Sequence, residues 1–373
     1  MVLKNKPVAE LLQYIKENKK SVVLFGAGVI GNTVVPELFR AQGLLESILF
    51  YVDNDTAKHG KTVQICGEER TIFGADALRQ IDVAMTVLLI TNSQYGAVVE
   101  QFDAMSELVE AECYIVPVML VSHPEYQESV GVVKESEVPL IPKVLHYIWL
   151  GKNKMLDALE ACIATWKDFC PEYEIVRWDE SNYDVARHPY MKQAYDAGKW
   201  AYVSDFARLD ILYEHGGIYM DTDVYLIKSL DELLYQRAFC SVEKWNVINS
   251  GGCCGTVKHG EAVGAMLEFR KGFQFGTSES GYNLTASGFY ETQAMIRNGY
   301  RMDGSFQKVL DMNIYPSEYF HPYDYMSGQL RKTEHTFSVH CFNGGWLEGE
   351  MTAQRKKTQE AYEAVLRRMD RMG

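Results

Sequence analysis

The chain has 373 residues, of which 47% are hydrophobic and 23% are charged, and its formal net charge is −13. This length is enough to bury two separate cores. The acidic balance argues against nucleic acid as a partner, because contact with phosphates requires a basic surface.

The first third of the chain has the layout of a nucleotide-binding βαβ unit. We predict a strand at 21–25, a glycine-rich turn leading into a helix that ends near residue 40, and a second strand at 47–53 that closes on an acid. Such glycines permit a tight turn and the close approach of a phosphate to a helix N-terminus, and the acid is placed for a ribose. The predicted nucleotide-binding residues are Gly26, Gly28, Gly31 and Asp53.

Further predicted strands at 86–90 and 113–116, with a helix over 98–109 between them, extend this region into an α/β domain. The stretch 51–61 resembles small Rossmann-like domains attached to bacterial sugar-modifying enzymes, and the resemblance implies binding of a nucleotide or nucleotide-sugar. Residues 1–120 contain no Tyr-x-x-x-Lys pair for hydride transfer, so a ligand-binding or scaffolding domain is favoured over a dehydrogenase. The alternative that stays open is an NAD(P)-dependent sugar-nucleotide oxidoreductase.

A polar, acidic and proline-punctuated segment follows this domain and has the composition of a linker. We therefore predict a Rossmann-like domain at 1–120, a linker at 121–139, a second α/β domain at 140–350 and a basic amphipathic helix at 351–373.

In the second predicted domain, residues 200–215 have helical spacing, which makes Asp205 and Arg208 neighbours on one face. We expect this helix to end at the glycine pair 216–217, and a short strand at 218–220 to bring the chain back toward that face. A surface ion pair beside a structural turn is the alternative interpretation.

Asp221 and Asp223 follow directly. Side chains alternate along an extended backbone, so these two carboxylates project to the same side. Holding them together is costly unless a cation neutralises them, and hard oxygen ligands suit Mg²⁺ or Mn²⁺, which keep positions open for phosphates. The pattern predicts a metal site that grips a nucleoside diphosphate.

Three segments together resemble a known family: Ile141-Pro-Lys-Val-Leu-His146-Tyr-Ile-Trp149-Leu-Gly151, Ser204-Asp205-x-x-Arg208 and Gly216-Gly-Ile-Tyr-x-Asp221-x-Asp223. Over residues 140–350 the chain is similar to glycosyltransferases with a sugar-binding region that contains a DXD motif. These include capsular-polysaccharide transferases and the yeast initiating mannosyltransferase. The resemblance implies a GT-A-type fold, Mn²⁺ or Mg²⁺, a nucleotide-sugar donor and retention of the anomeric configuration.

The resemblance also implies roles for individual residues. Asp205 and Arg208 would hold hydroxyls of the transferred sugar, Asp221 would contact the donor ribose and sugar, and Asp223 would be the direct metal ligand. A late segment, 337–346, looks like the family's His-x-x-x-x-Ser-Trp element, with Gly345 in place of the serine. The implied donor-binding set is Trp149, His146, Asn249, Thr285 and Trp346, and the implied metal set is Asp223, Asp221, His340 and Asn343.

The C-terminal segment combines apolar residues at helical spacing with basic neighbours. We expect this helix to dock on the catalytic domain, and the alternative is peripheral contact with an anionic membrane surface. The chain shows no signal peptide and no apolar run of about 18 residues, and its eight cysteines include no Cys-x-x-Cys pair, so we expect a cytoplasmic protein with reduced thiols.

Together these features predict a metal-dependent retaining glycosyltransferase. It would move a sugar from a nucleotide-sugar, with UDP as the expected nucleotide, to a glycan or lipid-linked acceptor in surface polysaccharide or glycoconjugate synthesis. A binding module with an inactive transferase half is disfavoured, because Asp205, Arg208, Asp221 and Asp223 are all present.

Overall fold

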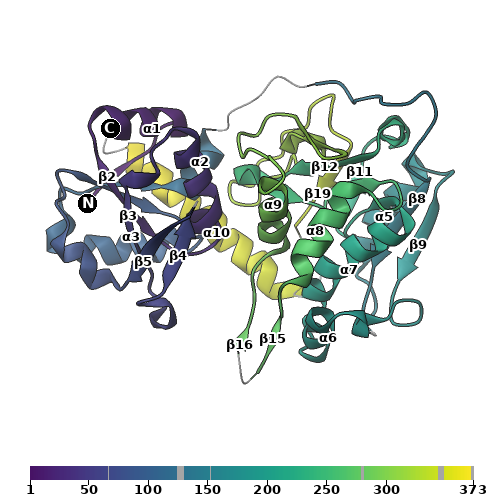
Figure 1. Ribbon diagram of the computed structural model, residues 1–373, viewed down its shortest axis with the longest axis horizontal. Helices are drawn as coiled ribbons and strands as arrows, with labels where there is room; N and C mark the ends of the chain where they lie inside the picture. The colour runs from purple at the N-terminus through teal and green to yellow at the C-terminus, as the bar shows by residue number, and fades with distance from the viewer. Residues whose placement is uncertain (66, 124–129, 152, 279–280, 343–347, 371–373) are drawn as a thin grey trace. The chain divides into compact units, whose positions relative to one another are not determined.

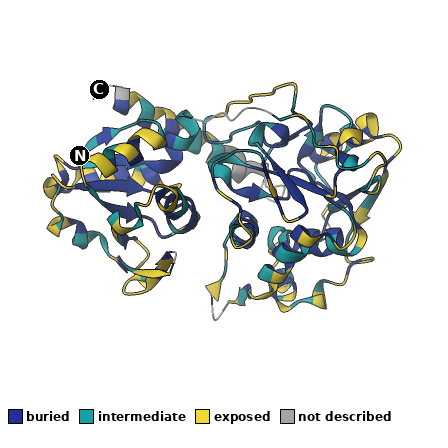
Figure 2. Ribbon diagram, turned by 45° about the horizontal axis from the view of Figure 1, so that its top comes forward, coloured by how far each residue is buried: buried dark blue, intermediate teal, exposed yellow. Residues whose placement is uncertain are grey.

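The computed structural model describes residues 1–65, 67–123, 130–151, 153–278, 281–342 and 348–370. It divides into two compact units, one formed by Met1–Tyr126 with Arg355–Gly373 and the other by Gln127–Gln354. Each unit is built around its own β-sheet, and Figure 2 shows the strands of both sheets as largely buried.

The first unit is a mixed sheet with helices packed around it (Figure 1). The strand order is β1-β7-β6-β2-β3-β5-β4, and every neighbouring pair is parallel except β4 with β5. The chain therefore winds outward from β2 in both directions, which places a change of winding direction at the carboxyl ends of β2 and β6. The strands are β1 (Val2–Lys4), β2 (Ser21–Phe25), β3 (Ile48–Val52), β4 (Thr62–Ile65), β5 (Glu68–Phe73), β6 (Thr86–Ile90) and β7 (Glu112–Ile115), and the helices are α1 (Val8–Glu17), α2 (Val35–Ala41), α3 (Tyr95–Asp103) and α4 (Val116–Ser122).

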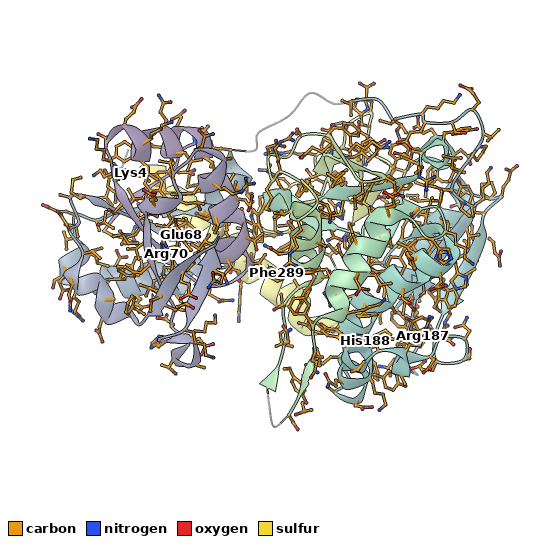
Figure 3. The ribbon with its side chains drawn as sticks, viewed as in Figure 1. Lys4, Glu68, Arg70, Arg187, His188 and Phe289 are labelled. Carbon is orange, nitrogen blue, oxygen red and sulfur yellow. The ribbon has the colours of Figure 1, made fainter. Side chains whose placement is uncertain are left out.

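The central strands are apolar runs because both of their faces are covered. Ion pairs lie at the rim, where Lys4 bonds Glu112 at 2.6 Å and Arg70 pairs with Glu68, and Figure 3 labels Lys4, Glu68 and Arg70. The helix predicted at 98–109 is the shorter α3 followed by a 3₁₀ turn.

The C-terminal helix α10 (Glu348–Asp370) changes one expectation. Its residues from Arg355 onward group with the first unit, not with the predicted catalytic domain. Arg368 pairs with Asp103, and the apolar side chains of Tyr362, Val365 and Met369 are buried. Because protein covers this apolar stripe, it is not available to lie on a membrane. Among the described residues, no helix combines the length and apolar character that crossing a membrane requires.

The second unit contains a larger mixed sheet in the order β17-β18-β12-β14-β10-β8-β9, with β13 paired to β12. β8, β9 and β10 are parallel, whereas β14 is antiparallel to both β10 and β12. The strands are β8 (Val144–Ile148), β9 (Glu174–Trp178), β10 (Gly217–Tyr219), β11 (Val224–Leu226), β12 (Ala238–Val242), β13 (Ile248–Asn249), β14 (Cys254–Thr256), β15 (Gly276–Thr277), β16 (Gly281–Tyr282), β17 (Gln307–Val309), β18 (Met312–Tyr315) and β19 (Ser338–His340).

The helices of this unit are α5 (Asp157–Phe169), α6 (Pro189–Asp196), α7 (Trp200–His215), α8 (Glu261–Lys271) and α9 (Ser287–Ile296). α6 begins where the His188 ring caps the N–H of Tyr190 and stacks on Phe206, next to the Arg187–Asp210 ion pair (Figure 3).

An apolar cluster of fully buried residues fills this unit, including Trp166 of α5. Met220 and Val224 belong to it and flank the acidic tripeptide, so the backbone on both sides of Asp221–Asp223 is fixed by packing.

Candidate functional site

The turn between α7 and β10 sets the direction in which the acidic tripeptide leaves the sheet. Gly216 and Gly217 both have positive φ, at +69° and +94°. A β-carbon at Gly216 would lie 2.8 Å from the backbone nitrogen of Lys258, so glycine is needed for space as well as for conformation. β10 then pairs with β8 and β14, and Asp221 emerges at the end of this strand.

A second pairing brings His340 to the two aspartates. β11 and β19 are antiparallel, with Val224 opposite His340, and the N–H of Cys341 donates to the carbonyl of Asp223 at 3.0 Å. Nε2 of His340 lies 3.3 Å from Oδ1 of Asp223 and 4.0 Å from Oδ2 of Asp221. We call Asp221, Asp223 and His340 the carboxylate–histidine cluster; one ligand atom from each lies within 4.8 Å of the others.

Arg208 joins this cluster to helix α7. Its side chain is only 5% exposed, and its guanidinium contacts Asp221 at 3.3 Å and pairs with Asp205 one turn away. The hydroxyl of Tyr219 donates to the second oxygen of Asp221 at 2.9 Å. The four residues predicted to be catalytic are therefore brought together, and Asp221 lies between the guanidinium and the histidine.

Burial and charge shape the protonation of the cluster. Burial raises the pKa of Asp221 above its usual value, and the charges of Arg208 and His340 oppose this. Burial lowers the pKa of His340, but the negative charges of Asp223 and Asp221 outweigh it, so the net direction is upward. The close carboxylates thus carry an electrostatic cost that added positive charge relieves.

The loop 249–252 contacts the backbone of Asp221 and thereby supports the carboxylate–histidine cluster. The carbonyl of Gly251 accepts the N–H of Asp221 at 2.8 Å, and the N–H of Gly251 donates to Oδ1 of Asn249 at 2.8 Å. A β-carbon at Gly251 would lie 3.0 Å from Cγ of Asp221 and still closer to Arg208, so a side chain there would displace the pair. Asn249, which is predicted to bind the sugar donor, thus shapes the loop that accepts a hydrogen bond from the backbone of Asp221.

Glu291 is a residue that the sequence analysis missed. It lies on α9 with 1% exposure, and its carboxylate accepts the N–H of Ser250 at 3.0 Å and the hydroxyl of Ser250 at 2.7 Å. Burial raises its pKa, and the charge of Arg208 opposes this. A glutamate in a helix whose other inward-facing residues are mostly apolar was the available signal, because a buried carboxylate needs partners.

Two of the predicted donor-binding residues are built into the core. Both ring nitrogens of His146 are occupied, Nε2 by the carbonyl of Gly216 at 2.9 Å and Nδ1 by the indole N–H of Trp178 at 3.1 Å. Burial lowers the pKa of His146 to about 4, so the ring is neutral at pH 7. Trp149 is 3% exposed and donates to the carbonyl of Asn153 at 3.0 Å. These contacts fix the end of β8, and they leave His146 no ring nitrogen with which to bind the nucleotide-sugar.

The remaining predicted residues divide into two groups. Thr285 is half-buried, and its described hydrogen bond, to Asn283, does not connect it to the carboxylate–histidine cluster. Asn343 and Trp346 lie outside the described residues.

In the first unit, the predicted nucleotide-binding turn is closely packed. Gly26 has φ +118°, and a β-carbon at Gly31 would clash with the carbonyl of Gly26, whereas Gly28 has open space around it. Asp53 accepts the N–H of Ala27 at 2.9 Å and the ammonium of Lys58 at 2.9 Å. Burial raises its pKa, but these and a further backbone bond outweigh it, so the net direction is downward. Asp53, which the sequence pattern predicts to bind a ribose, therefore also holds the glycine-rich turn through the Ala27 N–H.

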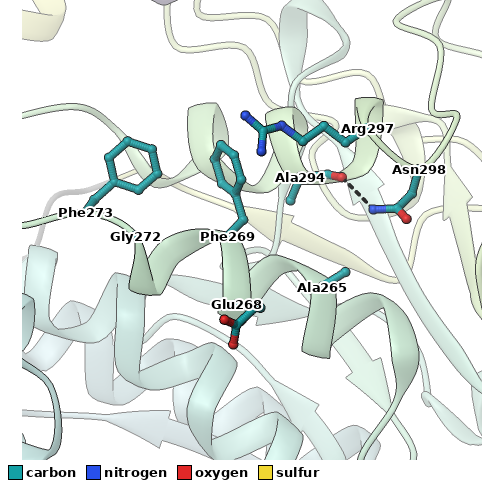
Figure 4. Close-up of a pocket in the computed structure, with 8 residues that line it drawn as sticks. All are labelled: Ala265, Glu268, Phe269, Gly272, Phe273, Ala294, Arg297 and Asn298. Atoms are coloured by element: carbon teal, nitrogen blue, oxygen red, sulfur yellow. Dashed lines mark hydrogen bonds between the residues drawn. The ribbon is translucent and has the colours of Figure 1, made fainter.

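A surface cavity of about 520 Å³ lies between α8 and α9 (Figure 4). Its wall includes Phe269 and Phe273, with the guanidinium of Arg297 placed 4.5 Å from the ring centroid of Phe269. None of its lining residues belongs to the carboxylate–histidine cluster. The carboxylate–histidine cluster is the better candidate for a reaction site, because a reaction requires polar groups that converge.

Comparison with known proteins gives the cluster a context. A family model described as a glycosyltransferase sugar-binding region containing a DXD motif matches residues 157–240. Inositol phosphoceramide mannosyltransferase 3 of Schizosaccharomyces pombe is 36% identical over 106 residues, which are 26% of this chain and 29% of that protein. Inositol phosphoceramide mannosyltransferase 2 of the same yeast is 31% identical over 104 residues, with the same shares.

Among solved structures, the PaToxG glycosyltransferase aligns with 16% identity over 55% of this chain and 78% of that one, at a TM-score of 0.36, which is too low to support an argument about fold. The chain spans less than a third of the length of these two relatives. The family model describes a glycosyltransferase sugar-binding region with a DXD motif, and the two relatives are named as mannosyltransferases. The matched region of this chain includes Asp205, Arg208, Asp221 and Asp223.

Proposed function

We propose that the chain is a metal-dependent glycosyltransferase that moves a sugar from a nucleotide-sugar to a glycan or lipid-linked acceptor. The observation that carries the proposal is the convergence of Asp221, Asp223 and His340, with Arg208 held against Asp221. The match to a sugar-binding region with a DXD motif supports the interpretation of these residues as a glycosyltransferase site.

The donor set fits a divalent ion. Ligands bound at about 2.1 Å to one ion lie at most about 4.2 Å apart. The His340 nitrogen is 3.3 Å and 4.0 Å from oxygens of Asp223 and Asp221, so small rotations of the carboxylates complete the set. Two carboxylate oxygens and an imidazole nitrogen suit Mn²⁺, and a bound ion would offset the charge of the diphosphate as it leaves.

The protein's own groups supply orientation. Arg208 presents a planar set of donors in a buried position, where its hydrogen bonds are strong and directional. Asp205 fixes one side of the guanidinium and Asp221 the other, so the remaining donors point in a defined direction. We propose that Arg208 and Asp205 hold hydroxyls of the transferred sugar, and that Asp221 contacts the donor ribose and sugar.

The configuration of the product is a separate part of the proposal. We propose retention, with the acceptor hydroxyl attacking from the side that the diphosphate leaves. Proton NMR of the first-formed product reads the anomeric coupling, and an inverted anomer would exclude retention without affecting the assignment as a transferase.

A donor screen tests the function. Thermal shifts of the full chain are measured with UDP-, GDP-, CMP- and dTDP-sugars and with NAD(P), each with and without Mn²⁺. GDP-mannose is included because the relatives are named as mannosyltransferases. A shift that requires both Mn²⁺ and one nucleotide-sugar is expected, and it should disappear in Asp223→Asn. The matched control is Asp157→Asn, whose side chain is 91% exposed. Absence of any Mn²⁺-dependent shift would exclude the proposal, and a metal-independent shift with NAD(P) would favour the oxidoreductase alternative.

A further inference from the structure

Close to the carboxylate–histidine cluster, three residues other than glycine have a left-handed backbone conformation. Trp245 and Asn246, with φ of 67° and 58°, form the tip of the hairpin between β12 and β13, and Phe342, with φ of 53°, follows β19. Glycine or asparagine is favoured at such hairpin positions, and a bulky side chain there is strained. Strain of this kind persists where surrounding contacts enforce it, and it gathers at ligand-binding positions.

The contacts that enforce the hairpin are specific. The N–H of Glu243 donates to Val247 at 2.8 Å, which closes the turn. The side chain of Asn246 donates to the carbonyl of Met302 at 3.1 Å, and the hydroxyl of Tyr300 donates to the carbonyl of Asn246 at 2.8 Å. The fold therefore holds Trp245 in a position that its own backbone preference disfavours.

Two of these strained residues, Trp245 and Phe342, lie together with Tyr325 around one ammonium group. Nζ of Lys244 lies 2.7 Å from the ring centroid of Tyr325, 5.0 Å from that of Trp245 and 5.5 Å from that of Phe342. The Lys244 side chain is 10% exposed, with Asp324 at 3.9 Å, whereas all three aromatic residues are partly exposed. We call Trp245, Tyr325 and Phe342 the aromatic cluster.

This aromatic cluster adjoins the proposed metal ligands. The Phe342 ring stacks on the ring of His340, with centroids 4.1 Å apart and planes 20° apart. Within the described residues, the indole nitrogen of Trp245 is buried without a hydrogen-bond partner. A donor group and three rings therefore lie beside the place where the diphosphate would be held.

The sheet order decides which part of the substrates lies here. β12 runs parallel to β10, because each is antiparallel to β14, so their carboxyl ends share one edge of the sheet. β8 and β9 lie on the other side of β10, and they form the parallel half, at whose carboxyl ends nucleotides bind in open α/β sheets. Asp221 follows β10, so the nucleoside side and the β12 hairpin lie on opposite sides of it.

We propose that the aromatic cluster, with Lys244, is a subsite for a carbohydrate ring of the acceptor. The inference rests on the proposed transferase function and names the acceptor side of the same site. The apolar face of a pyranose ring lies against an aromatic ring, and the Trp245 N–H and the Lys244 ammonium donate to its hydroxyls.

Direct binding tests the inference separately from catalysis. Methyl α-mannoside, methyl β-galactoside and methyl β-glucoside are titrated into the full chain with UDP and Mn²⁺ and followed by saturation-transfer NMR. Trp245→Ala should weaken binding of the best glycoside by about tenfold or more, and Trp245→Phe, which keeps an aromatic ring but lacks the N–H, should restore only part of the affinity. The control is Leu310→Ala, since Leu310 also has a left-handed backbone, with φ of 54°, at another turn of the same unit.

Each outcome has a defined meaning. Loss of glycoside binding in Trp245→Ala, with nucleotide-sugar affinity unchanged and Leu310→Ala like wild type, supports the subsite. Equal glycoside binding in wild type and Trp245→Ala overturns it, as does a wild-type chain that binds none of the glycosides. Loss of uridine or guanosine binding in place of glycoside binding would assign the rings to the nucleobase and also overturn it. Failure of the transferase function itself appears elsewhere, as the absence of Mn²⁺-dependent nucleotide-sugar binding in wild type.

Discussion

Adding one methyl group at Gly251 should disable the site while leaving the fold in place. The β-carbon of Gly251→Ala would lie 3.0 Å from Cγ of Asp221 and closer to that carboxylate's Oδ2 and to Nη1 of Arg208. Carbon contacts are comfortable at about 3.5 to 4.0 Å, so the Asp221 and Arg208 groups must withdraw by on the order of 1 Å.

The size of the effect follows from this displacement. A misplacement of about 1 Å in a positioned group costs about 100-fold in rate, which corresponds to about 2.7 kcal/mol in the barrier. Overpacking of a closed site costs about 1 to 3 kcal/mol of unfolding free energy. Both charged groups have side-chain torsions that share the adjustment, so we expect the lower end of the stability range.

Two measurements separate these effects. Steady-state transfer kinetics give kcat and KM, and thermal unfolding gives stability. The control is Gly272→Ala at the end of α8, because Gly272 has a φ of −68° and an added β-carbon would make only an ordinary contact of 3.4 Å. Gly251→Ala with activity equal to that of Gly272→Ala would show that the Arg208–Asp221 geometry does not determine the rate.

Three further predictions concern charge. Asp223→Asn should weaken Mn²⁺ binding by at least about tenfold, because a neutral amide replaces an anionic ligand. A Mn²⁺ titration followed by electron paramagnetic resonance measures this affinity. Unchanged binding would show that Asp223 is not a metal ligand. Glu291→Gln should lower kcat by about tenfold with little change in melting temperature, because it removes a buried carboxylate that interacts electrostatically with Arg208. The neighbouring Thr292→Val, which removes a 2.9 Å bond from the Ile248 N–H, should instead lower stability and spare kcat. The reverse pattern would refute a positioning role for Glu291. The bonds from Arg368 lower the pKa of Asp103, so the stabilisation from this pair is present above the ordinary aspartate pKa of about 3.9 and is lost as pH falls through the lower folded value. Arg368→Ala should therefore destabilise the first unit at pH 7 by less than about 1 kcal/mol, and its difference from wild type should shrink as the pH falls below that ordinary value. A difference independent of pH would contradict this.

Local pattern was sufficient for the elements that carry the acidic tripeptide. Helical spacing over 200–215, a glycine pair and an apolar strand are adjacent in sequence, and the structure places α7, the turn and β10 where these signals predict them. The proximity of Asp205, Arg208 and Asp221 follows from helix periodicity and one reversal, which is why sequence alone indicated it.

Contacts between distant segments could not be predicted in the same way. Gly251 lies close to Arg208 and Asp221, and Glu291 interacts electrostatically with Arg208, but no periodic pattern in the sequence links either position to Arg208. His146 shows the opposite failure, because a histidine in a recognised motif was assigned to the donor although both of its nitrogens hold the fold together. Motif membership predicts location better than it predicts which groups remain available for a ligand.

The β11–β19 pairing has a consequence for how the protein acquires its site. A short ladder of three residue pairs brings His340 to the aspartates and closes the chain between residues 223 and 340 into a loop. Closing so long a loop is entropically costly, so this ladder is expected to form late in folding. An ion that binds the completed cluster would stabilise the last step, so the rate at which Mn²⁺ affinity appears during refolding should report completion of the second unit.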